Sequence, residues 1–117
     1  MDKLKSILND ITQQPGVTAA IVIGWDGFAI ESSDDEDLDT DAVGAVISTG
    51  IGAAQVMGNE LRVGELTQAM CEFSNGIIFM SGVGDRAILA VLADPQGNVG
   101  NIRYQVRKRL PELAEIL

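Results

Sequence analysis

Asp41–Leu61 reads DAVGAVISTGIGAAQVMGNEL, and this stretch decides the fold. No charged residue occurs from Ala42 to Asn59. Apolar residues recur at intervals of three and four, which is the spacing of one helix face. The apolar surface covers most of the helix, so we expect it to be buried on more than one side. The stripe consists of Val43, Ile47, Ile51, Ala54, Gly58 and Leu61, widened by Val46, Gly50, Ala53 and Met57.

Small residues give this helix a second property. Each glycine lowers helix propensity by up to about 1 kcal/mol relative to alanine, so a compensating interaction is needed. Close approach to a neighbouring element is the simplest one. The charge-free length also allows a membrane-spanning alternative, because a span needs about 20 mostly apolar residues. Glycines and polar residues dilute the hydrophobicity and no basic flank follows, so we expect a helix held between a sheet and a second subunit.

The composition limits the class of protein. The 117 residues suggest one domain. The chain has a net charge of −9, from 17 acidic and 8 basic side chains. This balance argues against nucleic-acid binding and against docking on an anionic membrane. Cys71 is the single cysteine and there is no histidine, which excludes an internal disulfide and all histidine-dependent catalysis or metal binding. With no signal-peptide pattern at the start, we expect a cytoplasmic protein.

Periodicity along the rest of the chain predicts two further helices and five strands. The first helix carries an apolar stripe from Leu4 to Ile11, and the last begins after an Asn98 cap, with Pro111 either kinking it or starting a separate turn. Asp26-Gly27 and Asn75-Gly76 predict hairpins, the first with a type I′ turn. The order predicts an α+β domain with one antiparallel sheet. The predicted strands are 17–23, 28–31, 66–73, 77–81 and 87–93.

Glu31–Asp41 contains seven acids in eleven residues. Its alternating acids resemble a calcium-binding loop in composition only, because the required glycine and the closing glutamate are missing at Thr40 and Val46. We interpret the segment as a solvated loop whose end caps the central helix, through Asp39, Thr40 or Asp41.

No catalytic constellation is present in the sequence. Gly82–Ala87 matches G-x-G-x-x-A, but a dinucleotide site needs a following helix and a later acid, so a tight turn is the better interpretation. Cys71 has no base beside it, and we expect Met57, Met70 and Met80 to pack in the core. Arg62 and Arg86 are isolated, and no arginine is marked for insertion into a nucleotide site. The basic cluster from Arg103 to Arg109 is either a solvated helix face or a docking surface.

Several segments together resemble the roadblock/dynein light chain family over roughly the whole length. They are GVTAAIV at 16–22 with DGF at 26–28, the acidic run into a small-residue helix, and LAVLAD at 89–94 followed by NVG at 98–100. The short first helix and GFAIE at 27–31 look most like the bacterial MglB-type members. The acidic loop is longer and more charged than that pattern implies.

The resemblance implies a roadblock-type, profilin-like sandwich. In it, five antiparallel strands carry the long helix on one face and the terminal helices on the other. It also implies a non-enzymatic homodimer that regulates a Ras-like small GTPase of the MglA type, in which the partner's own residues perform the chemistry. A structural adaptor without effect on GTP hydrolysis is the alternative, and a small-molecule sensor or enzyme using the Gly82 turn is a third hypothesis.

The family arrangement also predicts where two copies meet. It joins them through the central helix and the third strand, giving a continuous sheet and an isologous contact. The expected contact residues are Gly44, Ile47, Ser48, Ile51, Gln55 and Asn59 on the helix and Leu66, Gln68 and Met70 on the strand. We expect no cofactor and no metal.

Overall fold

The computed structural model describes residues 2–33 and 38–117. The acidic positions from 34 to 37 lie outside this part, so the loop prediction is not tested there. The elements follow the predicted order of helix, two strands, helix, three strands and helix. They are α1 (Asp2–Thr12), β1 (Val17–Gly24), β2 (Ala29–Ser32), α2 (Thr40–Glu60), β3 (Ala69–Phe73), β4 (Gly76–Val83), β5 (Ala87–Ala93) and α3 (Val99–Ile116).

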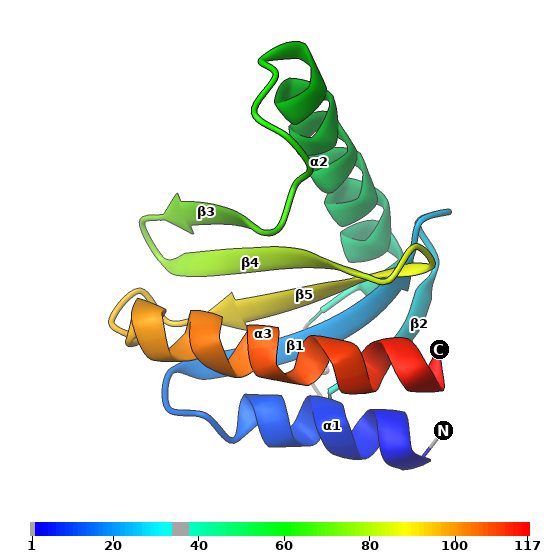
Figure 1. Cartoon of the computed structure of the whole chain (residues 1–117). Helices are drawn as coiled ribbons and strands as arrows, with labels where there is room; N and C mark the ends of the chain where they lie inside the picture. The colour runs from blue at the N-terminus through cyan, green and yellow to red at the C-terminus, as the bar shows by residue number, and fades with distance from the viewer. Residues whose placement is uncertain (1, 34–37) are drawn as a thin grey trace.

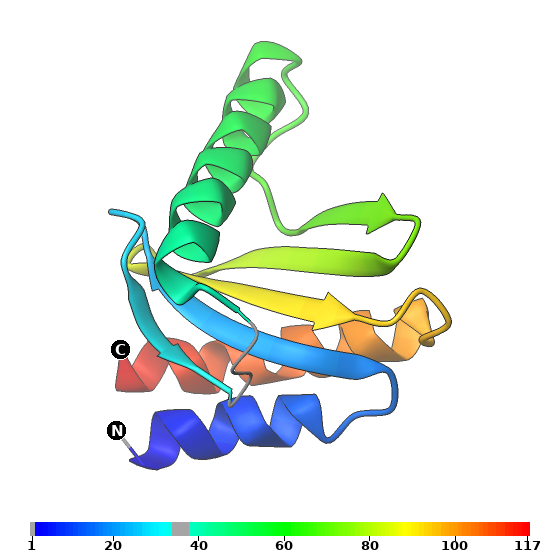
Figure 2. The same ribbon diagram turned by 180° about the vertical axis from the view of Figure 1, so that it is seen from behind.

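The five strands form one sheet in the order β2-β1-β5-β4-β3, and every adjacent pair is antiparallel. The strands β2 and β3 are the edges. Helix α2 stands on one face of this sheet, and α1 and α3 cover the other face side by side (Figures 1 and 2). The predicted α+β architecture is confirmed, including the separation of the long helix from the terminal helices.

Two hydrophobic layers hold the sheet between its helices. Side chains alternate along β1 and β5, so that Val22 and Leu89 face α1 and α3 while Ile21 and Ile88 face α2. Strands β1 and β5 are therefore buried on both faces. The β-branched run at 17–23 predicts this for β1. The larger layer lies under α1 and α3 and contains Phe79, which is completely buried.

Helix α2 has a defined cap at each end. The Asp39 side chain accepts a hydrogen bond from the Ala42 amide at 3.3 Å, so Asp39 is the N-cap among the three alternatives. At the C-terminal end, the amide of Val63 donates to the Gly58 carbonyl, and Arg62 has φ +57°. Arg62 occupies the left-handed position that glycine usually fills in this type of helix end.

The structure corrects two details of the predicted elements and decides a third that the sequence left open. Asp26 does not have positive φ, so the β1–β2 connection is not type I′; the Gly27 amide closes a Gly24–Gly27 turn and Gly27 itself has φ +91°. Strand β3 begins at Ala69 and not at Leu66, because pairing with β4 starts at the Ala69–Met80 pair. Helix α3 continues through Pro111 without ending there.

Candidate functional site around helix α2

Helix α2 packs on the sheet with only part of its length. Its buried residues are Gly44, Ile47 and Ile51, all in its first twelve positions. Beyond Ile51, the helix rises away from the sheet and its C-terminal end projects past β3 (Figures 1 and 2). The projecting part therefore offers surface on both of its flanks.

Gly44 holds the buried end of α2 against the β1–β2 turn. A Cβ atom at Gly44 would lie 2.2 Å from the Gly27 carbonyl oxygen, so only glycine permits this approach. The predicted close backbone contact is therefore found at this position. Gly52 differs, since a Cβ atom there would meet nothing within 4 Å.

An apolar groove lies along one flank of α2. It has a volume of about 560 Å³ and is bounded by the projecting half of the helix, the α2–β3 connection and β3. Four of its apolar side chains are strongly exposed: Met57 at 57%, Leu61 at 71%, Val63 at 76% and Met70 at 46%. Large apolar side chains gathered in one exposed patch mark an interaction surface.

The edge strand β3 forms the other wall of this groove. Only one side of β3 pairs within the sheet, through β4, so its outer backbone groups remain available to another strand. The prediction that Met57 and Met70 pack in the core is wrong, because 57% of Met57 and 46% of Met70 are exposed, on the projecting half of α2 and on the edge strand. Met80 is 6% exposed and does belong to the core.

The structure divides the residues expected at the dimer contact into three groups. Gly44, Ile47 and Ile51 are buried against their own sheet and have little surface for a second copy, whereas Ser48 lies beside Gly27 and is half-buried. Gln55 and Asn59 lie on the opposite flank from the groove. Those that border the groove are Leu66, Gln68 and Met70.

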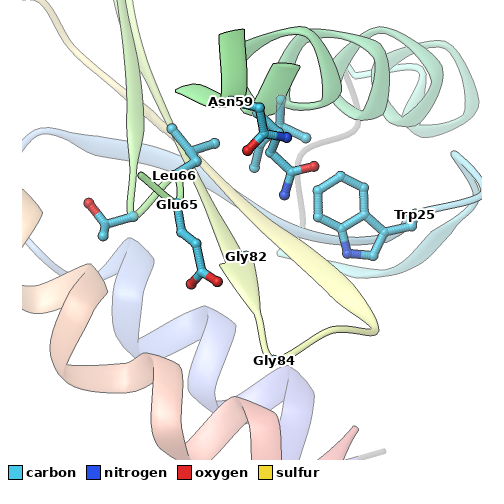
Figure 3. Close-up of a pocket in the computed structure, with 9 residues that line it drawn as sticks. Trp25, Asn59, Glu65, Leu66, Gly82 and Gly84 are labelled. Atoms are coloured by element: carbon cyan, nitrogen blue, oxygen red, sulfur yellow. The ribbon is translucent and has the colours of Figure 1, made fainter. Parts of the chain in front are cut away.

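A polar pocket of about 550 Å³ occupies the opposite flank of α2. Trp25 from the β1–β2 turn, Asn59 from α2 and Glu65 from the α2–β3 connection surround it (Figure 3). Gly82 and Gly84, from the motif noted in the sequence, form part of its wall without side chains. The remaining lining residues are Ile51, Gln55, Leu66 and Thr67.

Two consecutive side-chain hydrogen bonds hold the α2–β3 connection, which lines both the groove and the polar pocket. The Arg103 Nε of α3 donates to Gln68 Oε1 at 2.9 Å, and Gln68 Nε2 donates to Ser81 Oγ at 3.4 Å. Ser81 is 1% exposed, so the Gln68 side chain supplies a hydrogen-bond partner for the buried Ser81 hydroxyl. It thereby ties the start of β3 to helix α3.

The sequence did not single out Trp25, Leu61 or Val63 as site residues. Trp25 belongs to a turn that is distant in sequence from the rest of its pocket. The helical spacing predicts that Leu61 belongs to the buried stripe, and this is wrong, because α2 has left the sheet by that point and Leu61 is 71% exposed. Val63 lies beyond the helix, where that spacing no longer applies. Among residues 2–33 and 38–117, no group of three or more possible metal ligands is assembled, and no helix is long and apolar enough to cross a membrane.

The model of the Roadblock/LC7 domain family matches residues 3–93. The chain belongs to the Roadblock/LC7 family. The match spans α1 and all five strands, and the resemblance seen in the sequence is therefore confirmed. An uncharacterised protein of Methanocaldococcus jannaschii, MJ0310, is 33% identical over 102 residues, covering 87% of this chain and 89% of that protein.

Solved structures share the roadblock fold at low sequence identity. Myxococcus xanthus MglB superimposes with a TM-score of 0.90 at 20% identity, covering 97% of this chain and 94% of that one. A structure described as MglB with tetrameric arrangement gives a TM-score of 0.90 at 15% identity, covering 98% and 88%. These similarities extend over the whole domain, so α3 is part of the same fold.

Proposed function

We propose that this roadblock domain is a non-enzymatic, homodimeric regulator or scaffold of a Ras-like small GTPase, of the MglB-like, GTPase-activating type. Family membership and the MglB fold support the class of function. The MglB structure with tetrameric arrangement supports self-association. The proposed partner is MglA-like, and the proposed location is the cytoplasm.

The apolar groove beside β3 is the observation that carries the proposal. Met57, Leu61 and Val63 expose more than half of their surface in a groove that the protomer does not fill. Burial of apolar surface contributes roughly 25 cal/mol per Å², so covering these side chains favours association. A second copy supplies the same helix and the same edge strand, which fits an isologous contact.

The dimer surface proposed from the structure therefore differs from the one expected from the sequence. It keeps Leu66, Gln68 and Met70 and adds Met57 and Leu61. Pairing of the two β3 edges would continue the sheet across the dimer and satisfy the outer backbone groups. A continuous sheet with two projecting helices would then form the surface offered to the GTPase.

Light scattering tests the dimer directly. The expected mass is twice the 12.4 kDa of the chain. Met57→Lys places a charge in the groove and should give a monomer, whereas Val46→Lys, at an exposed apolar site on α2 outside the groove, should remain a dimer. A monomeric wild-type protein at micromolar concentration would overturn the proposed assembly, and a dimeric Met57→Lys variant would overturn the proposed surface.

Phosphate release tests the regulatory role. A Ras-like GTPase from the same genome is loaded with GTP or GDP and mixed with this protein. Nucleotide-dependent binding together with faster hydrolysis supports the proposal. Unchanged hydrolysis without nucleotide-dependent binding to any such GTPase of the genome overturns the regulatory role and leaves only the structural adaptor.

A further inference from the structure

We propose that the polar pocket between Trp25 and Glu65 binds a cationic group, either a guanidinium or a primary ammonium. The Roadblock/LC7 assignment and the proposed dimer do not require this site. The pocket opens on the other side of α2 from Met57 and Leu61, and it shares Glu65, Leu66 and Thr67 with the lining of the groove. Its volume of about 550 Å³ is in the range of small-ligand sites.

The charge of the lining selects the sign of the ligand. Glu65 is the one charged residue among the nine that line the pocket, and no lysine or arginine is among them. Glu65 makes no ion pair with any residue of the described part of the chain. A phosphate or a carboxylate would therefore meet a negative charge without a compensating cation. The net charge of −9 also favours the approach of cations over anions.

The uncharged residues suit the same ligand. Figure 3 shows Trp25 and Glu65 on different sides of the pocket, with Asn59 of α2 between them. An indole face attracts a cation, and tryptophan does so more strongly than the other aromatic side chains. The side-chain carbonyls of Gln55 and Asn59 can accept hydrogen bonds from N–H donors. A guanidinium, with five donors in one plane, can reach the carboxylate and an amide together.

Gly82 leaves room for a ligand, because a Cβ atom there would meet only the Gly84 carbonyl oxygen, at 3.7 Å. A Cβ atom at Gly84 would instead lie 3.9 Å from Ala114 of α3. Gly82 and Gly84 lie where the β4 strand ends and turns, and they line the pocket without side chains. Gly84 has φ +58°, a conformation that residues with a Cβ atom rarely adopt. The segment that resembles a dinucleotide fingerprint in sequence thus borders a pocket whose one charged lining residue is the acid Glu65.

The chain carries its own reporter for the test. Trp25 is the single tryptophan, so fluorescence excited at wavelengths that tryptophan alone absorbs, and not Tyr104, reports on this pocket. Wild-type protein is titrated with n-butylguanidinium and with n-butylurea, which has the same shape without the charge. We expect a saturable fluorescence change with the guanidinium and about tenfold weaker binding of the urea, because charge-assisted hydrogen bonds are the stronger ones. No saturable change, or equal affinity for the two compounds, would overturn the proposal.

Two variants separate the pocket from general charge effects. Glu65→Gln should weaken guanidinium binding about tenfold. Glu60→Gln removes an equal charge from an exposed residue of α2 that does not line the pocket, and should leave binding within twofold. Equal effects of Glu65→Gln and Glu60→Gln would overturn the site while leaving the dimer and GTPase measurements unaffected.

The source of the cation is distinguished by a third titration. A blocked Ala-Arg-Ala tripeptide presents the guanidinium on a peptide backbone, and the same peptide with citrulline removes the charge. Binding of the arginine peptide at least as tight as that of n-butylguanidinium supports a protein side chain as the natural ligand. Binding of n-butylguanidinium that is ten times tighter supports a free small cation. Equal binding of the arginine and citrulline peptides would contradict cation recognition.

Discussion

Replacement of Gly44 by alanine tests the packing of α2 on the sheet. The new Cβ atom would lie 2.2 Å from the Gly27 carbonyl oxygen and 3.2 Å from the Gly27 carbonyl carbon. The oxygen and the Cβ atom must separate to about 3.4 Å to reach ordinary contact. Both atoms belong to backbones or are fixed to them, so no side-chain rotation relieves the overlap. The helix or the β1–β2 turn must move.

Two opposing terms set the size of the effect. Overpacking of this kind costs about 1–3 kcal/mol, and the strain here falls on the backbone, which places it in the upper part of that range. Alanine offsets up to about 1 kcal/mol of this cost, because its helix propensity is higher than that of glycine. The net loss is therefore about 1–2 kcal/mol, which corresponds to a decrease in Tm of about 4–8 °C for a domain of this size.

Gly52→Ala is the matched control on the same helix. A Cβ atom at Gly52 meets nothing within 4 Å, so only the propensity term acts and Tm should rise by up to about 4 °C. Thermal unfolding of both variants is followed by circular dichroism at one protein concentration. A Gly44→Ala protein as stable as Gly52→Ala would refute the close approach. A loss of stability in Gly52→Ala that grows with protein concentration would place Gly52 against a second copy.

Other substitutions test the core, the caps and the surface ion pairs. Phe79→Ala removes a completely buried ring and should cost about 3–5 kcal/mol in urea unfolding, with a smaller loss indicating that the layer under α3 refills the space. Asn98→Ala removes the side chain that accepts from the Asn101 amide at 3.0 Å and should cost about 1 kcal/mol, which the unfolding midpoint measures. Asp10→Asn breaks an exposed pair with Arg109 and should change stability by less than about 1 kcal/mol; a larger loss that persists at high salt would contradict the surface character of this pair.

The arrangement of the layers follows from patterns that the sequence shows locally. A stripe at helical spacing from Leu4 to Ile11 has only one side to bury, and it packs against the sheet as expected. The continuous apolar run in β1 requires cover on both faces, and α2 provides it on one of them. Asn98 and Asp39 act as caps because their short side chains reach the free amides of the next turn. Each of these features depends on a few neighbouring residues, which is why it could be predicted.

The groove and the polar pocket are formed by residues that are distant in sequence. The stripe of α2 covers most of the helix, so its spacing could not decide whether Met57 and Leu61 face the sheet or the groove. The answer lies in the angle at which α2 leaves the sheet, and Gly44 permits that angle through its contact with Gly27. The polar pocket likewise combines the β1–β2 turn, α2 and the end of β4. No local pattern relates these three segments.

The length of α2 gives the strongest physical reason for a partner. Its 21 residues extend about 30 Å, but its last fully buried side chain is Ile51, so about 14 Å of helix continues beyond the sheet. Most helical stability in proteins comes from packing of an apolar face, and this part of α2 has no fully buried residue within its own protomer. Its end also places Arg62 in a conformation that glycine adopts at lower cost. A projecting, apolar helix end of this kind is stabilised when a second surface covers it, as the proposed dimer would do at the groove beside β3.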